Sequence, residues 1–133
     1  MIDKAFSKRG RIKARRNAVH ALYQWHMTNV DIVDVIEQFK QGRQEIKKAD
    51  CDYFENLLRG VKKCHEDVQQ NYLKLLDRPL DEIDPVERSV LDLGIYELLY
   101  HPELPWRVVI NEYVELAKMF GAEDSHKYIN NIL

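Results

Sequence analysis

Apolar residues recur along almost the whole chain at the spacing of an amphipathic α-helix, and no other feature of the sequence limits the fold as strongly. The i, i+3, i+4, i+7 rule is followed first by Val19, Leu22, Tyr23 and His26, and then, after a polar turn, by Ile32, Val35, Ile36 and Phe39. Strand-like alternation and repeats of fixed period do not accompany this spacing. The pattern predicts an all-α fold.

A stretch rich in proline and aspartate divides the helical pattern near its middle. It reads DRPLDEIDP over residues 77–85 and ends with Asp84 as an N-cap before Pro85 at the first helical position, with Glu87 placed as in a capping box. The helix that begins there has apolar residues around much of its circumference, so we expect it to be central. The break indicates two helical halves, roughly 11–76 and 85–133, packed into a single domain, 1–133.

Single residues predict further helix boundaries. Asp50 can cap a helix that continues through Val68, because Gly60 weakens such a helix by about 1 kcal/mol relative to alanine without ending it. Pro105 can open a later helix, and Ser125 can cap the last one.

The net charge of −2 hides a segregated distribution of charge. Between Lys4 and Val30 there are seven basic residues and no acidic one, whereas the rest of the chain has 13 basic and 22 acidic residues. The basic cluster consists of Lys4, Lys8, Arg9, Arg11, Lys13, Arg15 and Arg16. Segregation of this kind predicts a polyanion at one end and a basic partner along the rest.

The basic cluster lies where positive charge destabilises a helix. Each close charge at a helix N-terminus costs about 0.3–1 kcal/mol against the helix dipole, which is easier to understand if a phosphate chain binds there. A solvated, disordered arm is the other interpretation. Tyr23, Trp25 and Tyr128 accompany the cluster, and no helix-turn-helix arrangement is visible. Aromatic rings stack on unpaired bases, so the sequence favours single-stranded RNA over DNA, although such rings are also typical of a core.

Catalytic and metal-binding signatures are missing from the sequence. It has no glycine-rich phosphate loop, H-E-x-x-H motif, paired C-x-x-C or nucleophile elbow, and its five histidines are dispersed. Cys51 and Cys64 are 13 residues apart, about 20 Å along a straight helix, so we expect reduced thiols. With no signal sequence and no apolar segment near 18 residues, we predict a cytoplasmic protein that is not an enzyme and holds neither cofactor nor metal.

Three blocks of sequence, taken in order, resemble the transcription antitermination factor NusB family. They read HALYQW from residue 20, DPVERSVLDLGIYELL from residue 84 and VINEYVELAKMFGAEDSHKYINNIL from residue 109. The resemblance implies an all-α, NusB-like bundle of about seven helices that binds RNA. In that family the protein pairs with the ribosomal protein NusE, and together they hold the boxA element of nascent rRNA leaders on elongating RNA polymerase, with other Nus factors, in antitermination.

The resemblance also assigns functional residues. The basic arm and first helix are the family's RNA-contacting region, the turn EDSHKY completes that surface, and acidic positions at the start of the central helix face NusE. Together with the charge pattern, this predicts RNA contacts at Lys8, Arg9, Arg11, Lys13, Arg15, Arg16, Tyr23, Asp124, Ser125, Lys127 and Tyr128. The predicted NusE contacts are Asp81 and Glu87.

Two other interpretations stay open from the sequence. NusB-like domains also occur as accessory domains of RNA cytosine methyltransferases, and some relatives form homodimers that hide the RNA face, so we expect a monomer or a weak homodimer. The chain stops at Leu133 inside a helical pattern, from which we expect a further tail. Asn131 stands where the usual family pattern has glycine.

Overall fold

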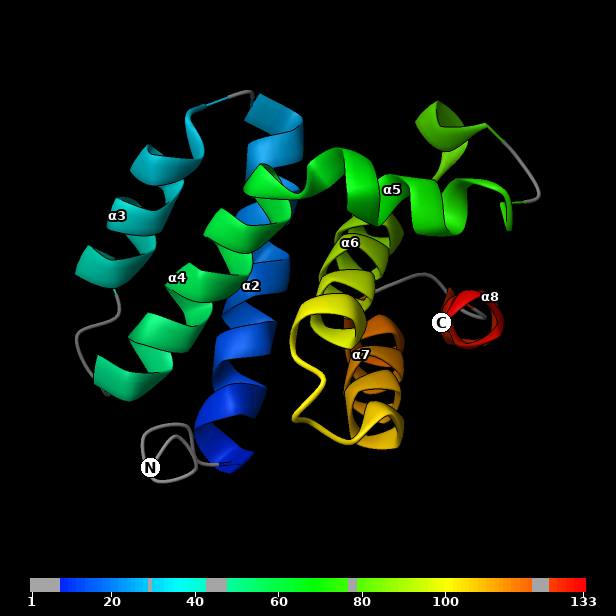
Figure 1. The fold of residues 1–133 in the computed structure, drawn as a ribbon. Helices are drawn as coiled ribbons and strands as arrows, with labels where there is room; N and C mark the ends of the chain where they lie inside the picture. Colours follow the sequence, from blue (N-terminus) through cyan, green and yellow to red (C-terminus); the bar gives the residue numbers. More distant parts are fainter. Residues whose placement is uncertain (1–7, 29, 43–47, 77–78, 121–124) are drawn as a thin grey trace.

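The computed structural model describes residues 8–28, 30–42, 48–76, 79–120 and 125–133, and all regular structure within them is helical (Figure 1). The elements are α2 (Lys8–Thr28), α3 (Ile32–Gly42), α4 (Lys48–Lys63), α5 (His65–Leu73), the 3-10 helix η1 (Leu80–Glu82), α6 (Pro85–Tyr100), α7 (Trp106–Phe120) and α8 (Ser125–Ile132). The predicted all-α class and the predicted number of about seven helices are confirmed. None of the described helices is long and apolar enough to cross a membrane.

The central element of the fold is α6. In Figure 1 it stands between the group formed by α2, α3 and α4 and the helix α7, and it packs against α2, α4, α5, α7 and α8. Every residue from Ser89 to Glu97 is buried, including the polar ones. The prediction of a central helix contacted on several sides is therefore confirmed.

Local chemistry explains where α6 and α7 begin. The carboxylate of Asp84 accepts a hydrogen bond of 2.7 Å from the backbone N–H of Val86, and Pro85 occupies the first helical position without losing a helical hydrogen bond. The helix α7 begins directly after Pro105, whose carbonyl accepts hydrogen bonds from the N–H groups of Val108 and Val109. Both starts agree with the sequence-based predictions.

The helix predicted from Asp50 through Val68 is two helices. The first, α4, begins two residues earlier than expected and ends at Lys63, and Cys64, with φ −104° and ψ 22°, joins it to α5. In Figure 1 α5 crosses the upper end of α6 at a steep angle to α4. This turn places Val68 and Tyr72 in the core, where both are fully buried. A straight continuation of α4 would instead carry these side chains past α6.

Gly60 has a packing role within α4. A Cβ atom built at this position would overlap the ring of Tyr96 on α6, so the absence of a side chain allows the two helices to approach closely. The intrinsic cost of glycine within a helix is thereby offset by contact between α4 and α6.

Candidate nucleic-acid interface

One face of α2 remains open to solvent along most of its length. We call it the α2 stripe and define it by the exposed residues Lys13, Arg16, His20, Tyr23 and Met27. These positions are three or four residues apart, so their side chains line up on one side of the helix over about 21 Å. The stripe begins with two cations and continues with an imidazole, a phenol ring and a thioether. It therefore combines positive charge with flat, exposed side chains.

Arg15 does not belong to this stripe, and the structure corrects its predicted position on the RNA surface. Its side chain is only 2% exposed and faces the interior between the buried residues Ala14 and Ala18 of α2. Nε donates to Glu97 Oε2 at 2.8 Å and Nη2 donates to Glu97 Oε1 at 2.9 Å, so the two side chains form a bidentate ion pair. Arg15 is therefore a core residue that ties α2 to α6.

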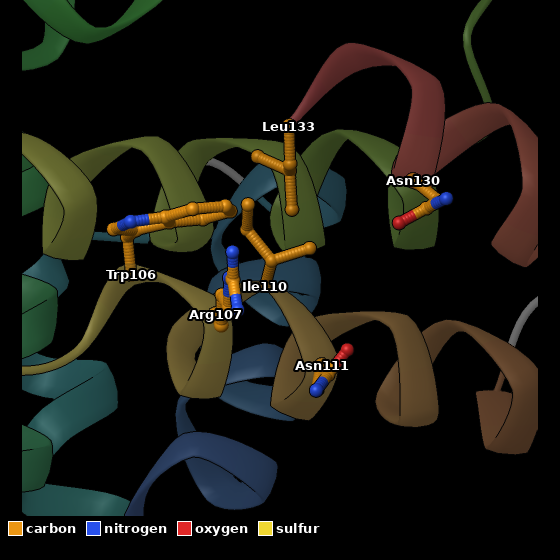
Figure 2. A pocket seen from close by; sticks show the side chains of 6 residues that line it. All are labelled: Trp106, Arg107, Ile110, Asn111, Asn130 and Leu133. Atoms are coloured by element: carbon orange, nitrogen blue, oxygen red, sulfur yellow. The ribbon is translucent and has the colours of Figure 1, made fainter.

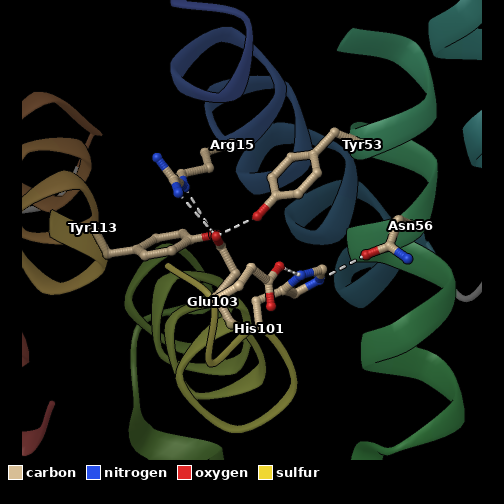
Figure 3. Close-up of polar contacts among 7 residues, drawn as sticks. Arg15, Tyr53, Asn56, His101, Glu103 and Tyr113 are labelled. Carbon is tan, nitrogen blue, oxygen red and sulfur yellow. Dashed lines mark hydrogen bonds and ion pairs between the residues drawn. The ribbon is translucent and has the colours of Figure 1, made fainter. Parts of the chain in front are cut away.

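Two tyrosines complete the environment of the Glu97 carboxylate. The Tyr53 hydroxyl of α4 donates to Oε1 at 2.6 Å, and the Tyr113 hydroxyl of α7 donates to Oε2. In Figure 3 the side chains of Arg15, Tyr53 and Tyr113 point toward one another, and all three donate to the Glu97 carboxylate. We call Arg15, Tyr53, Glu97 and Tyr113 the buried network. Because its members come from α2, α4, α6 and α7, it connects the N-terminal and C-terminal helices.

The buried network shifts the pKa of its members in a consistent direction. Burial and then the charge of Glu97 raise the pKa of Tyr53 and of Tyr113 above the ordinary value, so both hydroxyls stay protonated and can donate. Burial alone would lower the pKa of Arg15, but the hydrogen bonds and charge of Glu97 outweigh it and raise that pKa. The network therefore consists of one cation, one carboxylate and two neutral donors.

The other predicted RNA contacts on α2 lie at its N-terminal end. Lys8 and Arg9 form the first turn of α2, but their side chains lie outside the described residues. Arg11 is half-buried. Its positive charge acts to lower the pKa of Tyr53 and of Glu103, which lies in the loop before α7. Lys13 and Arg16 are exposed, as the sequence predicts for a polyanion-binding surface.

The predicted contacts in the turn EDSHKY flank the start of α8. Asp124 lies outside the described residues, as do the side chains of Ser125 and Tyr128, while Lys127 is exposed. At the end of α7, the ring of Phe120 lies 4.5 Å from the ring of His20 in an edge-on arrangement. This contact places the end of α7 beside the middle of the α2 stripe.

The two aromatic residues at the end of HALYQW have different environments. Tyr23 is 38% exposed and belongs to the α2 stripe. Trp25 is half-buried, packs against the hydrophobic core and meets the ring of His65 at 6.2 Å. The ring available for stacking is thus that of Tyr23. His20 and Met27 also belong to the stripe although they were not predicted, and the three-and-four spacing from Lys13 is the signal that identifies them.

The predicted partner-binding acids stand at the start of the central helix. Asp81 is in η1, with its side chain outside the described residues, whereas Glu87 is only 8% exposed. Burial corrects the expectation that Glu87 presents its carboxylate to a partner. The exposed carboxylates at this place are Glu82 and Asp84. Among the described residues, no three His, Cys, Asp or Glu side chains lie close enough together to hold a metal ion.

Comparisons with known proteins agree with the resemblance seen in the sequence. The NusB family model matches residues 12–133. Transcription antitermination protein NusB of Shewanella amazonensis is 45% identical over 123 residues, which cover 92% of this chain and 91% of that protein. Its counterpart from Hydrogenovibrio crunogenus is 47% identical over 124 residues, with 92% and 76% covered.

Solved structures share the fold. T. maritima NusB superposes with a TM-score of 0.85 at 28% sequence identity, over 92% of this chain and 86% of that one. A crystal structure of antitermination factors NusB and NusE in complex with dsRNA superposes with a TM-score of 0.86 at 24% identity, over 94% and 93% of the two chains. The latter similarity concerns the fold alone.

Proposed function

The chain belongs to the NusB family, whose members are transcription antitermination factors and not enzymes, and from this premise we propose that it is an adaptor that binds boxA-type single-stranded RNA together with NusE. The observation that carries the proposal is the α2 stripe, which offers cations for a phosphate chain and an exposed phenol ring for a base. In this role the protein acts on nascent rRNA leaders and reaches the RNA polymerase elongation complex through other Nus factors.

Different parts of the α2 stripe contribute electrostatic attraction and base stacking. Lys13 and Arg16 attract phosphates and release counterions from them, which supplies affinity without sequence preference. Tyr23 lies two to three helical turns further on and offers its ring to a splayed base. In this proposal the basic residues Lys8, Arg9 and Arg11 extend the phosphate path toward the N-terminus of α2. Asp124, Ser125, Lys127 and Tyr128 stay proposed RNA contacts because of the family resemblance.

The choice of single strands depends on the exposed ring. A structural relative was solved with NusE and double-stranded RNA. A-form helices hide their base edges in a deep, narrow groove, where Tyr23 would find no base face to stack on. We therefore propose that this chain binds unpaired RNA more tightly than duplex RNA. The two affinities can be compared directly.

The partner surface that we propose lies around η1 and the start of α6. Asp81, Glu82 and Asp84 provide acidic groups there, and the chain outside the basic cluster carries an excess of acids. A basic ribosomal protein such as NusE fits a surface of this sign. Complementary charge of this kind mainly accelerates association and selects the partner.

Replacing Lys13 and Arg16 together with alanine should reduce the salt dependence of RNA binding. Two phosphate contacts on a single strand account for a slope of about 1.4 in log K against log salt, so the loss of affinity between 50 and 200 mM salt should become roughly sevenfold smaller. The measurement is a titration of labelled boxA-like RNA, a scrambled strand and a duplex, each with and without NusE.

The matched control removes two exposed lysines elsewhere, Lys63 and Lys74, and changes the net charge equally. Its salt slope should equal that of the unchanged protein. Equal slopes for both double variants would remove the α2 stripe as the phosphate site. Equal, weak binding to all three RNAs with and without NusE would contradict the proposed function as a whole.

Changing Tyr23 to alanine should weaken binding of single-stranded RNA by roughly 5- to 150-fold, because one stacked base contributes about 1–3 kcal/mol. The salt slope should not change, since no phosphate contact is lost. Tyr23→Phe is the matched control and should retain most of the affinity, because it keeps the ring. A loss of affinity in Tyr23→Phe equal to that in Tyr23→Ala would instead assign the effect to the hydroxyl group.

A further inference from the structure

A second exposed aromatic residue lies away from the α2 stripe, at the first position of α7. Trp106 is 59% exposed, although large aromatic side chains usually bury most of their surface. It borders a hollow of about 410 Å³ between α7 and α8, within the range of roughly 300–1,000 Å³ typical of small-ligand sites. The hollow is lined by Trp106, Arg107, Ile110, Asn111, Asn130 and Leu133 (Figure 2).

The lining combines the ring of Trp106 with polar side chains that can form further hydrogen bonds. The guanidinium carbon of Arg107 lies 5.0 Å from the centroid of the Trp106 ring, which provides a cation beside a stacking surface. Within the part of the chain that the structure describes, the side-chain amides of Asn111 and Asn130 make no hydrogen bond. None of the described residues that line this hollow has a carboxylate side chain. The set suits a ligand that is flat, carries hydrogen-bonding edges and bears negative charge.

We infer that this hollow binds one nucleotide of the RNA strand, with the base stacked on Trp106, its edge bonded to Asn111 or Asn130, and its phosphate beside Arg107. An amide side chain can donate and accept at once, which matches the paired donors and acceptors of base edges. A ring with a neighbouring arginine is the combination that single-strand binders use for stacking. This inference rests on the proposed function and adds a second contact point for the same strand.

The position of α7 relative to α2 supports one continuous path. The Arg15 guanidinium lies 5.9 Å from the Tyr113 ring centroid, and His20 meets Phe120, so the two helices run in the same direction side by side. Trp106 precedes Tyr113 by seven residues, as Lys8 precedes Arg15. Both therefore lie about 10 Å toward the same end of the molecule. A strand that follows the basic cluster can thus continue toward the hollow.

The neighbouring hollow differs in chemistry. It holds about 400 Å³, also borders Trp106, and is otherwise lined mainly by apolar residues, namely Leu98, Pro102, Leu104 and Pro105, together with Glu103. That lining would suit an apolar protein segment and repel a phosphate. The contrast is the reason for choosing a nucleotide, and not a peptide, for the hollow between α7 and α8.

Fluorescence of Trp106 offers a direct test. The chain has two tryptophans, so the variant Trp25→Phe leaves Trp106 as the single indole reporter. A boxA-like single-stranded RNA with a fluorescent label should quench this emission with the same midpoint as the rise in anisotropy of the label. Trp106→Leu should weaken RNA binding roughly 5- to 150-fold, while Trp106→Phe should keep most of the affinity.

The outcomes separate this inference from the proposed function. RNA binding by anisotropy without quenching, and with unchanged affinity of Trp106→Leu, would overturn the inference and leave the proposed function intact. Absence of RNA binding to the unchanged protein would overturn both. Quenching by NusE without RNA would assign the hollow to a protein contact. The thermal midpoint of Trp106→Leu should match that of the unchanged protein, because the indole is mostly exposed.

Discussion

Replacing Glu97 with alanine is expected to lower the free energy of unfolding by about 3–5 kcal/mol, because the change leaves the buried guanidinium of Arg15 without its counterion. The hydroxyl groups of Tyr53 and Tyr113 also lose their acceptor. Urea unfolding followed by circular dichroism measures this loss. Glu97→Gln, which keeps the shape and removes the charge, should lie between the alanine variant and the unchanged protein.

The control for this prediction is a carboxylate near the surface. Glu55 pairs with Lys40 at 3.0 Å and with Arg59 at 2.6 Å, and all three side chains reach solvent. Glu55→Ala should therefore cost less than about 1 kcal/mol. The double variant Arg15→Met with Glu97→Leu should regain part of the stability lost in Glu97→Ala, since it leaves no unpaired buried charge, although the hydroxyls of Tyr53 and Tyr113 still lack their acceptor. A cost for Glu97→Ala no greater than that for Glu55→Ala would show that the buried network does not hold the helices together.

Raising the pH above 10 is expected to destabilise the fold steeply. Burial raises the pKa of Tyr53, Tyr72 and Tyr113 above the ordinary value of 10.0, and the carboxylates that accept their hydrogen bonds raise it further. The acceptor is Glu97 for Tyr53 and Tyr113, and Asp92 at 2.5 Å for Tyr72. The folded protein therefore keeps three protons that the unfolded chain releases above pH 10.

The sign of this effect follows from proton linkage. Because the folded pKa is raised, the stabilisation is fully present below the unfolded pKa near 10 and is lost as the pH rises toward the folded pKa. Each of the three tyrosines should lower the free energy of unfolding by up to about 1.4 kcal/mol per pH unit in that range. Urea midpoints between pH 8 and pH 11 test this, together with phenolate absorbance of the folded protein. Tyr72→Phe should reduce the slope by the contribution of one tyrosine, and buried tyrosines that ionise near pH 10 in the folded state would contradict the prediction.

The buried network explains how α2 can contribute both a charged surface and buried core residues. Arg15 fixes α2 to α6 from inside, while Lys13, two positions before it, and Arg16, the next residue, are exposed to solvent. The RNA-binding surface that we propose on α2 would gain from this support, because the backbone that carries Lys13 and Arg16 is already ordered before binding. Variants of Glu97 that still fold are therefore useful for separating the stability of α2 from its charge.

Several features of this protein were predictable because they depend on neighbours in sequence. Asp84 as N-cap and Pro85 as the first helical residue determined where α6 begins. The apolar residues around the circumference of α6 indicated that it is central. Segregated charge predicted a basic helix end, and Lys13 and Arg16 are exposed there. Helix formation, capping and charge segregation act over a few residues, so the sequence alone carries their signals.

Other features were decided only by the tertiary structure. Arg15 and Arg16 are adjacent residues of the same type, yet Arg15 is buried because Glu97, 82 positions away, neutralises it. The break at Cys64 likewise exists because α5 must turn to place Val68 and Tyr72 over α6. Burial of a charge depends on which distant group meets it, since only a paired charge can leave water without a large loss of free energy. Local sequence determined the helical class, the starts of α6 and α7 and the sign of the surface. The packing of distant helices determined the break at Cys64, which cation supports the fold and which cations face solvent.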